Sequence, residues 1–438
     1  MTPNRMCIPI VSSPPDRERW SLCAVGDVCA LKGNSQVGPA RPIERRFDQD
    51  LKALIRSAEI SIVNLEAPTC RADRPIPKSG PSLRMDESVP VGLKQIGFDV
   101  ATLANNHTMD FGPDGLAETL ARCRQAGLLT CGAGASRAAA MQPTLVQPAG
   151  GIRVRVLAFC EREFGIASDG VAGTAWLSDA EALDAVAHAQ AESDVVIVAV
   201  HGGVEVAPLP PPQRCRQLRR IVDAGATLVI GHHPHVPHGW ERYRNGVILY
   251  SLGNCLFDYP DGEKLPKTDW GIAVTATFDG ATLTDVEITL TAQRTGTVGV
   301  LRCVRNHWDY LKRLSELTTD PDLLEAYWQE LAVRLLADRY WPYLLHAVRG
   351  SNDETGIRAD GRRLLQSIGH CLRPIKRTAK LGELPRATDP LLLLNLVRNE
   401  SHRWTIATAL ELMGGDVADR RTPQIQSEIR ELMKWTME

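Results

Sequence analysis

Three histidines in four residues follow directly after an apolar segment, and this feature constrains the fold more than any other. The segment at 226–230 reads Ala-Thr-Leu-Val-Ile, and it is followed by Gly231, His232, His233, Pro234 and His235. A short apolar run that stops at a glycine predicts a buried strand whose following loop lies at the carboxyl edge of a sheet. Because imidazole is the commonest protein ligand for borderline divalent metals, the run predicts a metal site in preference to a solvent-exposed loop.

Four other apolar segments also end in side chains that can bind metal or carry protons. They begin near residues 22, 60, 100 and 194, and they end in Asp27, Glu66, the pair Asn106 and His107, and His201. Strand patterns alternate with helical patterns up to about residue 200, as in βα units, so we expect these ends to meet at one sheet edge. Carboxylates, an amide oxygen and imidazoles there suit two divalent ions that share a bridging carboxylate.

These segments also occur in the order found in a known family. In this sequence they read Gly-Asp, Asn-Leu-Glu, Leu-Ala-Asn-Asn-His-Thr-x-Asp-x-Gly, His-x-Gly-x-Glu, Gly-His-His-Pro-His-Val and Tyr-Ser-Leu-Gly-Asn. This order, over roughly residues 20 to 290, resembles the CapA-like branch of the calcineurin-like metallophosphoesterase superfamily. The resemblance implies an α/β fold: a metallophosphatase-like β-sandwich flanked by helices, in the layer order α/β/β/α, with a two-metal site at the sheet edges.

The resemblance also implies a ligand set for two divalent ions of manganese, zinc, iron or cobalt. The implied ligands are Asp27 and His235 at one ion, Asn106, His201 and His233 at the other, and Glu66 between them. Asn64, from the same strand end as Glu66, is an alternative partner. His107 would lie beside the metals as an acid/base that binds neither ion.

Two segments depart from the superfamily's usual pattern. The first usually reads Asp-x-His, whereas here Cys29 stands two residues after Asp27. The usual bridging aspartate segment is replaced by Asn64-Leu65-Glu66, which has a longer carboxylate arm. Both changes leave coordination positions of one metal open. This disfavours ordinary phosphoester hydrolysis and leaves Lewis-acid chemistry available.

Two reactions fit such a site. The metals could polarise a phosphoryl group and activate water. Alternatively, they could hold a carboxylate or amide carbonyl and acidify the neighbouring Cα–H through a metal-stabilised enolate, while His107 and a second acid/base, Glu205 or His232, remove and return the proton.

The second chemistry resembles that of the MslH-type family of lasso-peptide epimerases, stand-alone CapA-like proteins that invert the carboxyl-terminal residue of a precursor peptide. We therefore expect a metal-dependent peptide epimerase with a peptide substrate whose terminal carboxylate binds at the metals. The alternatives are a dinuclear phosphoester hydrolase and an accessory protein of poly-gamma-glutamate capsule synthesis.

Length and periodicity predict two domains. At 438 residues the chain exceeds one ordinary core, and helical periodicity with many Trp and Leu residues replaces the strand pattern from about residue 300. The predicted division is a tail at 1–19, a catalytic domain at 20–300 and a helical extension at 301–438. We expect the extension to recognise a large substrate. Further local predictions are a surface loop at 138–151 and helix starts at Asp389-Pro390 and Thr422-Pro423.

Composition argues against several other classes of protein. The formal net charge of −2 gives no basic face for nucleic acid. Residues 1–19 contain no apolar stretch of signal-peptide or membrane-spanning length, so we expect a cytoplasmic protein that does not contact a membrane. The eleven cysteines are scattered without Cys-x-x-Cys spacing, which predicts free thiols in a reducing compartment.

Overall fold

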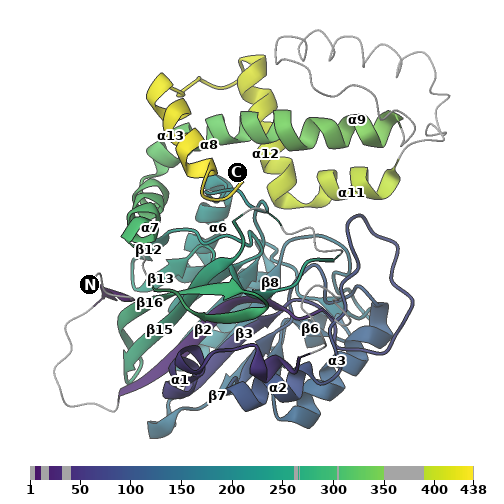
Figure 1. The fold of residues 1–438 in the computed structure, drawn as a ribbon, viewed down its shortest axis with the longest axis vertical. Helices are drawn as coiled ribbons and strands as arrows, with labels where there is room; N and C mark the ends of the chain where they lie inside the picture. The colour runs from purple at the N-terminus through teal and green to yellow at the C-terminus, as the bar shows by residue number, and fades with distance from the viewer. Residues whose placement is uncertain are drawn as a thin grey trace.

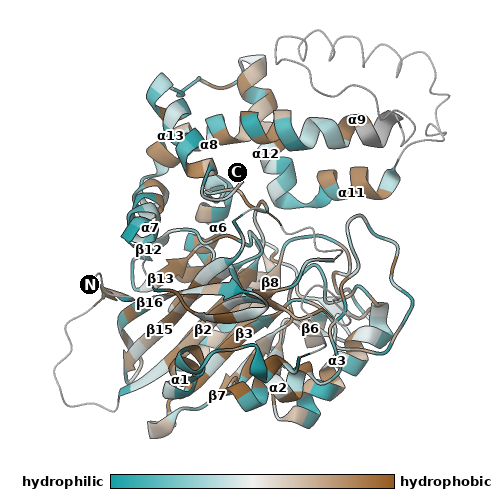
Figure 2. Ribbon diagram, viewed as in Figure 1, coloured by the Kyte–Doolittle hydropathy of each residue, from teal (hydrophilic) through white to brown (hydrophobic). Residues whose placement is uncertain are grey.

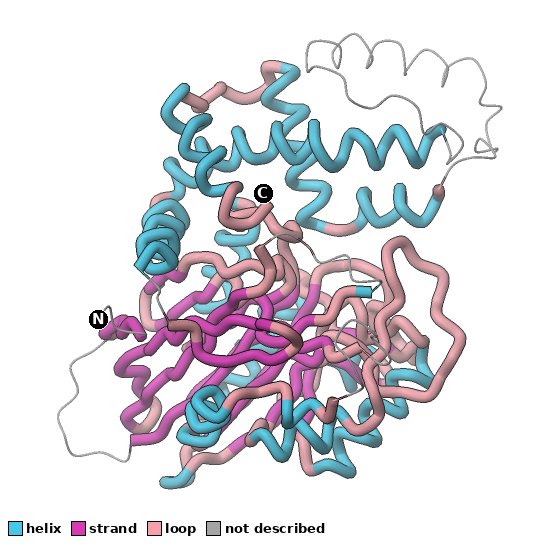
Figure 3. Tube along the Cα trace, in the orientation of Figure 1, coloured by secondary structure: helices cyan, strands magenta, loops and turns pink. Residues whose placement is uncertain are grey.

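Two mixed β-sheets pack face to face in this protein, with helices on their outer faces and a helical region at one end (Figure 1). The computed structural model describes residues 5–10, 19–31, 41–260, 265, 267–302, 305–349 and 389–437. Figure 3 shows that the strands gather in one part of the molecule and the C-terminal helices in another. The predicted α/β fold with the layer order α/β/β/α is confirmed.

The first sheet has the strand order β1-β16-β15-β2-β3-β4-β5, with β14 beside β2 and β17 beside β16. Its strands are β1 (Arg5–Pro9), β2 (Arg19–Cys29), β3 (Ile60–Leu65), β4 (Val100–Thr102), β5 (Leu129–Cys131), β14 (Asn254–Phe257), β15 (Trp270–Asp279), β16 (Thr282–Arg294) and β17 (Thr297–Val300). β2, β3, β4 and β5 are parallel neighbours, so their carboxyl ends lie at one edge. β1 pairs with β16, so the segment predicted as a tail contributes an edge strand.

The second sheet has the order β12-β13-β11-β10-β8-β7. Its strands are β7 (Thr144–Val146), β8 (Val154–Cys160), β10 (Val195–His201), β11 (Leu228–His232), β12 (Trp240–Tyr243) and β13 (Gly246–Leu249). β8, β10, β11 and β13 are parallel, and His201 pairs in register with His232. The prediction of a loop at 138–151 was wrong, because β7 and the end of helix α4 (Arg137–Ala140) lie there. β7 is too short to show periodicity, and its antiparallel pairing with β8 defines it.

Alternate residues of β2 face two different hydrophobic cores. Leu22 and Ala24 belong to the core between the sheets, whereas Cys23 and Val25 belong to a second core beneath the outer helices. Successive strand residues face opposite sides of a sheet, so an apolar strand of this kind is covered on both faces. The helices that cover the outer face of the first sheet are α1 (Gln49–Ser57), α2 (Val89–Ile96) and α3 (Gly112–Ala126). Those that cover the second sheet are α5 (Glu181–Ala191) and α6 (Pro212–Asp223).

Figure 2 shows hydrophobic residues along the strands and mixed colouring on the helices that cover them. This pattern is expected of helices that bury one face and expose the other. None of the helices in the described ranges combines the length and the apolar character that spanning a bilayer would require.

The C-terminal region is helical, as predicted, over the residues that the structure describes. Its helices are α7 (Arg305–Thr319), α8 (Pro321–Leu335), which continues through a π-helical turn at Leu336–Tyr340 into α9 (Trp341–Arg349), α11 (Pro390–Arg398), α12 (Glu400–Gly414) and α13 (Pro423–Met433). The two predicted starts are confirmed, because the side chains of Asp389 and Thr422 accept backbone hydrogen bonds from the first turns of α11 and α13. Residues 350–388 of the predicted helical extension lie outside the described residues.

One continuous hydrophobic core joins this helical region to the sandwich. The cluster that contains strand residues of both sheets also contains Trp308, Trp328 and Tyr340. Trp435 of the C-terminal end stacks on Tyr310 and packs edge-on against Trp270 of β15. The tryptophans therefore serve mainly as core residues, and the helices cover one end of the sandwich.

Candidate metal centre

The polar strand ends of both sheets meet at one place. Asp27 lies two residues before the end of β2, Glu66 follows β3, Asn106 follows β4, His201 ends β10, and His233 and His235 follow β11. Five of these six side chains form two groups, Glu66-His201-His233 and Asp27-Glu66-His235, and within each group the possible ligand atoms lie within 4.8 Å of one another. Glu66 belongs to both groups, and every member is buried. We call these the His201 cluster and the Asp27 cluster.

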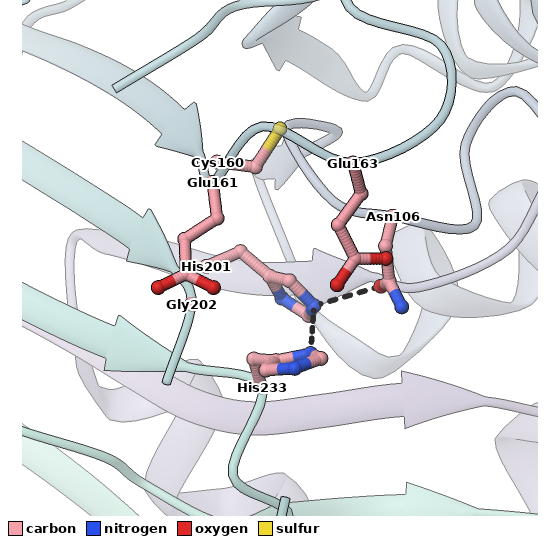
Figure 4. A pocket seen from close by; sticks show the side chains of 7 residues that line it. All are labelled: Asn106, Cys160, Glu161, Glu163, His201, Gly202 and His233. Carbon is pink, nitrogen blue, oxygen red and sulfur yellow. Dashed lines mark hydrogen bonds between the residues drawn. The ribbon is translucent and has the colours of Figure 1, made fainter. Parts of the chain in front are cut away.

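The distances within the His201 cluster are short. His201 Nε2 lies 3.1 Å from His233 Nδ1 and 3.0 Å from Asn106 Oδ1 (Figure 4). It also lies 3.5 Å from Glu66 Oε1. Asn106 thus joins this cluster as a possible oxygen ligand. In the Asp27 cluster, His235 lies 3.7 Å from Asp27 and 3.8 Å from Glu66 Oε1.

The residues present fit a pair of divalent ions. Both carboxylate oxygens of Glu66 are buried and have no hydrogen-bond partner in the described part of the chain. Burial, and then the charge of Asp27, raise the pKa of Glu66 well above its ordinary value. Burial lowers the pKa of His201 well below its ordinary value and that of His233 to about 3, so both imidazoles are neutral and keep a lone pair. A buried carboxylate without a partner is costly, and a cation at this position would satisfy it.

Close packing of the backbone explains the glycines in two of the sequence motifs. A Cβ added to Gly26 would lie 2.0 Å from the carbonyl oxygen of Gly253, and one added to Gly231 would lie 2.1 Å from that of Tyr250. Any other residue at these positions would push the segment at 250–253 away from the strands. The glycines therefore let this segment pack closely against both the strand that carries Asp27 and the strand that leads to the histidines.

The loop after β11 has an unusual conformation. His233 and His235 have φ angles of 96° and 61°, in the left-handed region that residues with a Cβ rarely adopt. Such conformations cost about 1–3 kcal/mol each and persist where the surroundings enforce them, often at functional sites. Here the backbone N–H of His233 donates to Asp27 Oδ2 at 3.1 Å, which ties the loop to the strand end opposite.

Asn64 and His232 fix the position of the Asp27 carboxylate through hydrogen bonds. Asn64 Nδ2 and His232 Nδ1 donate to Asp27 Oδ1 at 2.9 and 2.8 Å. Burial raises the pKa of Asp27, but the hydrogen bond from His232 and the electrostatic interactions with His232, His201 and His235 together outweigh it, and the net result is a lowered pKa. The structure therefore places Asn64, the alternative ligand, and His232, a predicted acid/base, as residues that orient a candidate ligand.

Asn254 has the same role at His235, and its role was not predicted although it ends the Tyr-Ser-Leu-Gly-Asn segment. Its Oδ1 lies 2.9 Å from His235 Nδ1, so that nitrogen donates and Nε2 is left to face Glu66. Cys29, by contrast, is buried in the core beneath the outer helices and belongs to neither cluster. Burial, and then the charge of Glu66, raise its pKa well above the ordinary thiol value, so Cys29 remains a neutral thiol.

His107 is held by two residues whose roles were not predicted from the sequence. Its Nδ1 donates to Asp110 Oδ2 at 2.8 Å, and Lys78 Nζ lies 3.2 Å from the same nitrogen while pairing with Asp110 Oδ1. Burial, and then the charge of Lys78, lower the pKa of His107. The imidazole is therefore neutral, and its Nε2 is the nitrogen that can accept a proton.

The helical region contributes residues around the same centre. Arg339 donates to the backbone oxygen of Glu205 at 2.9 Å, and the Tyr340 hydroxyl lies 2.9 Å from His402 Nδ1. Burial raises the pKa of Glu205, but the electrostatic interactions with His233, Arg339, His235 and His402 together outweigh it and lower the pKa to about 2. Glu205, the other predicted acid/base, is therefore an ionised carboxylate held by the helical region.

A small cavity opens beside the His201 cluster, between it and the turn after β8 (Figure 4). Its lining residues are Asn106, Cys160, Glu161, Glu163, His201, Gly202 and His233. Glu161 is buried in an ion pair with Arg214. Burial, and then the charge of Glu205, raise the pKa of Glu163 to about 7. Neither acidic residue was singled out from the sequence, because both lie on an irregular turn without a recognisable motif.

Fold and site together define an α/β sandwich with a candidate dinuclear metal centre at the strand ends. The chain belongs to the family of bacterial capsule synthesis proteins PGA_cap, whose model matches residues 21–259.

Among its relatives, the capsule biosynthesis protein CapA of Bacillus anthracis is 28% identical over 257 residues, which are 56% of this chain and 61% of that protein. The PGA biosynthesis protein CapA of Bacillus subtilis is 38% identical over 175 residues, or 39% of this chain and 46% of that protein. This chain thus spans less than two thirds of either relative. A probable polyglutamine synthesis accessory protein of Mycobacterium tuberculosis is 30% identical over 58% of this chain and 70% of its own length.

Similar solved structures include the 5′-nucleotidase of Candida albicans, with 14% sequence identity and a TM-score of 0.38 over 71% of this chain and 58% of that one. TT1561 of Thermus thermophilus has 10% identity and a TM-score of 0.33, over 61% of this chain and 98% of that one. The α/β sandwich is defined by the sheet topology of this chain itself.

Proposed function

We propose that this protein is a metal-dependent epimerase that inverts the Cα centre of the carboxyl-terminal residue of a ribosomal, lasso-type precursor peptide. The observation that carries the proposal is an incomplete ligand set beside an oriented histidine. The two clusters share Glu66, and His107 is held next to them by Asp110 without belonging to either.

The ligand set leaves room for substrate oxygen atoms. The Asp27 cluster offers three protein side chains, and Cys29, where the superfamily usually has a histidine, stands away as a neutral thiol. Divalent ions take four to six ligands, so open positions would accept a bridging carboxylate as readily as a phosphate. When bound, two such cations would supply the charge neutralisation that lowers the pKa of the Cα–H beside that carboxylate.

His107 is suited to remove that proton. Asp110 fixes its tautomer through Nδ1, which leaves Nε2 as the acceptor, and its lowered pKa keeps the ring neutral near pH 7. As the Cα–H bond breaks, the electron pair moves into the carboxyl group and the proton passes to Nε2. The same nitrogen returns a proton in the reverse direction.

The helical region lies where it could contact a large substrate. Arg339 contacts Glu205, and burial lowers the pKa of His402 to about 4 although the charge of Glu205 acts in the opposite direction. Residues of the extension thus stand around the centre, where they could recognise a peptide that leads away from the metals. We propose a peptide substrate and no nucleic acid or membrane partner.

Deuterium uptake tests the proposal. Candidate precursor peptides are incubated with the metal-loaded protein in deuterated water and analysed by mass and by the configuration of the terminal residue. We expect one deuteron at the terminal Cα together with inversion, and no uptake after chelation. Hydrolysis of a phosphodiester without deuterium uptake into any peptide would instead show a phosphoesterase, which the same ligand set would serve.

Family membership favours a second candidate function, an accessory role in poly-gamma-glutamate capsule synthesis. Two relatives are described as capsule or PGA biosynthesis proteins. The neighbouring genes distinguish the two functions. A small precursor-peptide gene with leader-processing enzymes supports epimerisation, whereas polyglutamate ligase genes support capsule synthesis.

A further inference from the structure

Inversion of a carbon centre requires a proton acceptor on one face and a proton donor on the other. His107 can serve only one face. We propose that Glu163, in the turn after β8, is the second catalytic acid/base and acts on the face opposite His107. This inference rests on the epimerase function proposed above.

Glu163 lies at the centre. It lines the same small cavity as Asn106, His201 and His233, and Figure 4 shows its carboxylate directed into that cavity. A group that exchanges a proton with substrate must reach it directly or through one water, and this cavity adjoins the candidate ligands. Glu205 does not line it, and His232 is bound to Asp27.

Glu163 and His107 are held by different residues. Glu163 lines the cavity beside the His201 cluster and accepts a hydrogen bond from Asn399, whereas His107 does not line that cavity and is held by Asp110. They are thus two separate proton carriers, as an inverting reaction requires.

One hydrogen bond fixes Glu163 and leaves the other oxygen free. Asn399 Nδ2 donates to Glu163 Oε1 at 2.8 Å, and no hydrogen bond within the described ranges engages Oε2. Asn399 is itself fixed, since its oxygen caps α12 through the backbone N–H of His402 at 3.0 Å and its amide also donates to Glu161 at 3.0 Å. The helical region therefore holds Glu163 in place, and Asn399 is a positioning residue.

The chemistry balances without a further reactant. His107 Nε2 takes the proton from one epimer as the Cα–H electron pair moves into the substrate carboxyl group, and the protonated carboxyl group of Glu163 gives its Oε2 proton to the other face as that electron pair forms the new Cα–H bond. In the reverse direction the two groups exchange roles. No oxidant, reductant or co-substrate is consumed.

The test compares two epimers of one peptide. Glu163→Gln keeps the side-chain shape and an oxygen that can accept from Asn399, but it cannot carry the proton. With metal-loaded protein in deuterated water, we expect Glu163→Gln to lose exchange at the terminal Cα of one epimer by about 100-fold or more, while the other epimer still exchanges. His107→Gln is expected to show the opposite preference. Glu192→Gln, an exposed carboxylate at the end of α5, is the control and is expected to match the parent protein.

Metal content and thermal unfolding are measured for each variant. Inversion at the parental rate by Glu163→Gln would overturn the assignment, and so would equal loss of exchange from both epimers at unchanged metal content. If Glu163→Gln does not fold, Asn399→Ala retains the carboxylate and is expected to slow exchange of the same single epimer; an equal effect on both would overturn the assignment. A parent protein that exchanges neither epimer refutes the epimerase function itself, and the role of Glu163 with it.

Discussion

Replacing Glu66 separates the behaviour of a metal ligand from that of an ordinary buried carboxylate. Glu66 is fully buried and both its oxygens lack a partner among the described residues. Glu66→Gln removes the charge and keeps the shape. We expect the variant to be more stable than the parent protein without metal and less stable with metal.

Without metal, the difference in stability between Glu66→Gln and the parent protein follows from the raised pKa of Glu66. The unfolded chain releases the Glu66 proton at a pKa of about 4.3, whereas the folded protein, in which burial and the Asp27 charge raise that pKa, retains it. Above the unfolded pKa the folded state binds more protons, so stability falls as pH rises until the folded pKa is passed. The decline is about 1.4 kcal/mol per pH unit. Glutamine does not titrate, so Glu66→Gln lacks this decline.

With metal bound, the difference in stability between the two proteins has the opposite sign. An ion present at 100 times its Kd stabilises the folded state by about 2.7 kcal/mol. Because Glu66 belongs to both clusters, its loss is expected to weaken the binding of both ions and to remove most of this stabilisation. The order of stability of the two proteins therefore reverses when metal is added.

Urea unfolding between pH 5 and pH 8 measures this reversal, first after chelation and then with added Mn²⁺ or Zn²⁺. Glu192→Gln is the control, since its side chain is 61% exposed and no metal effect is expected. The reasoning is refuted if Glu66→Gln is less stable than the parent at every pH without metal, or if metal stabilises both proteins equally.

Three further predictions concern other parts of the molecule. Asp110→Asn is expected to lower the exchange rate about 100-fold or more at unchanged metal content, because His107 loses its orientation; an unchanged rate would remove Asp110 from the mechanism. Arg214→Met is expected to destabilise folding by about 3–5 kcal/mol in urea unfolding, because it leaves the buried Glu161 without its cationic partner; a loss below 1 kcal/mol would contradict this. Truncation after residue 300 is expected to give aggregated protein in size-exclusion chromatography, since the helices share the sandwich core; a soluble, metal-binding fragment would show an independent domain.

The arrangement of strand ends could be predicted because parallel strands impose it. Asp27, Glu66 and His201 each follow an apolar run, and adjoining parallel strands bring such ends to one edge. The structure gathers the six expected ligands there, in the grouping that the family resemblance implies. Metal binding by these residues stays a prediction.

The residues around the ligands could not be predicted, because distant segments supply them through tertiary packing. Lys78 lies in an irregular stretch before α2, and only folding places it 3.2 Å from His107. Asn399 is more than two hundred residues from Glu163, and no periodicity links them. His232 lies in the same motif as the candidate ligands His233 and His235, and only the folded structure shows that its Nδ1 makes a hydrogen bond to Asp27.

Anomalous diffraction from crystals of the manganese- or zinc-loaded protein tests the dinuclear centre most directly. We predict two anomalous peaks at the strand ends, one bound by His201 and His233 and the other by Asp27 and His235, with Glu66 bound to both. A single peak away from Glu66, or no peak in protein that elemental analysis shows to be metal-loaded, would contradict the account.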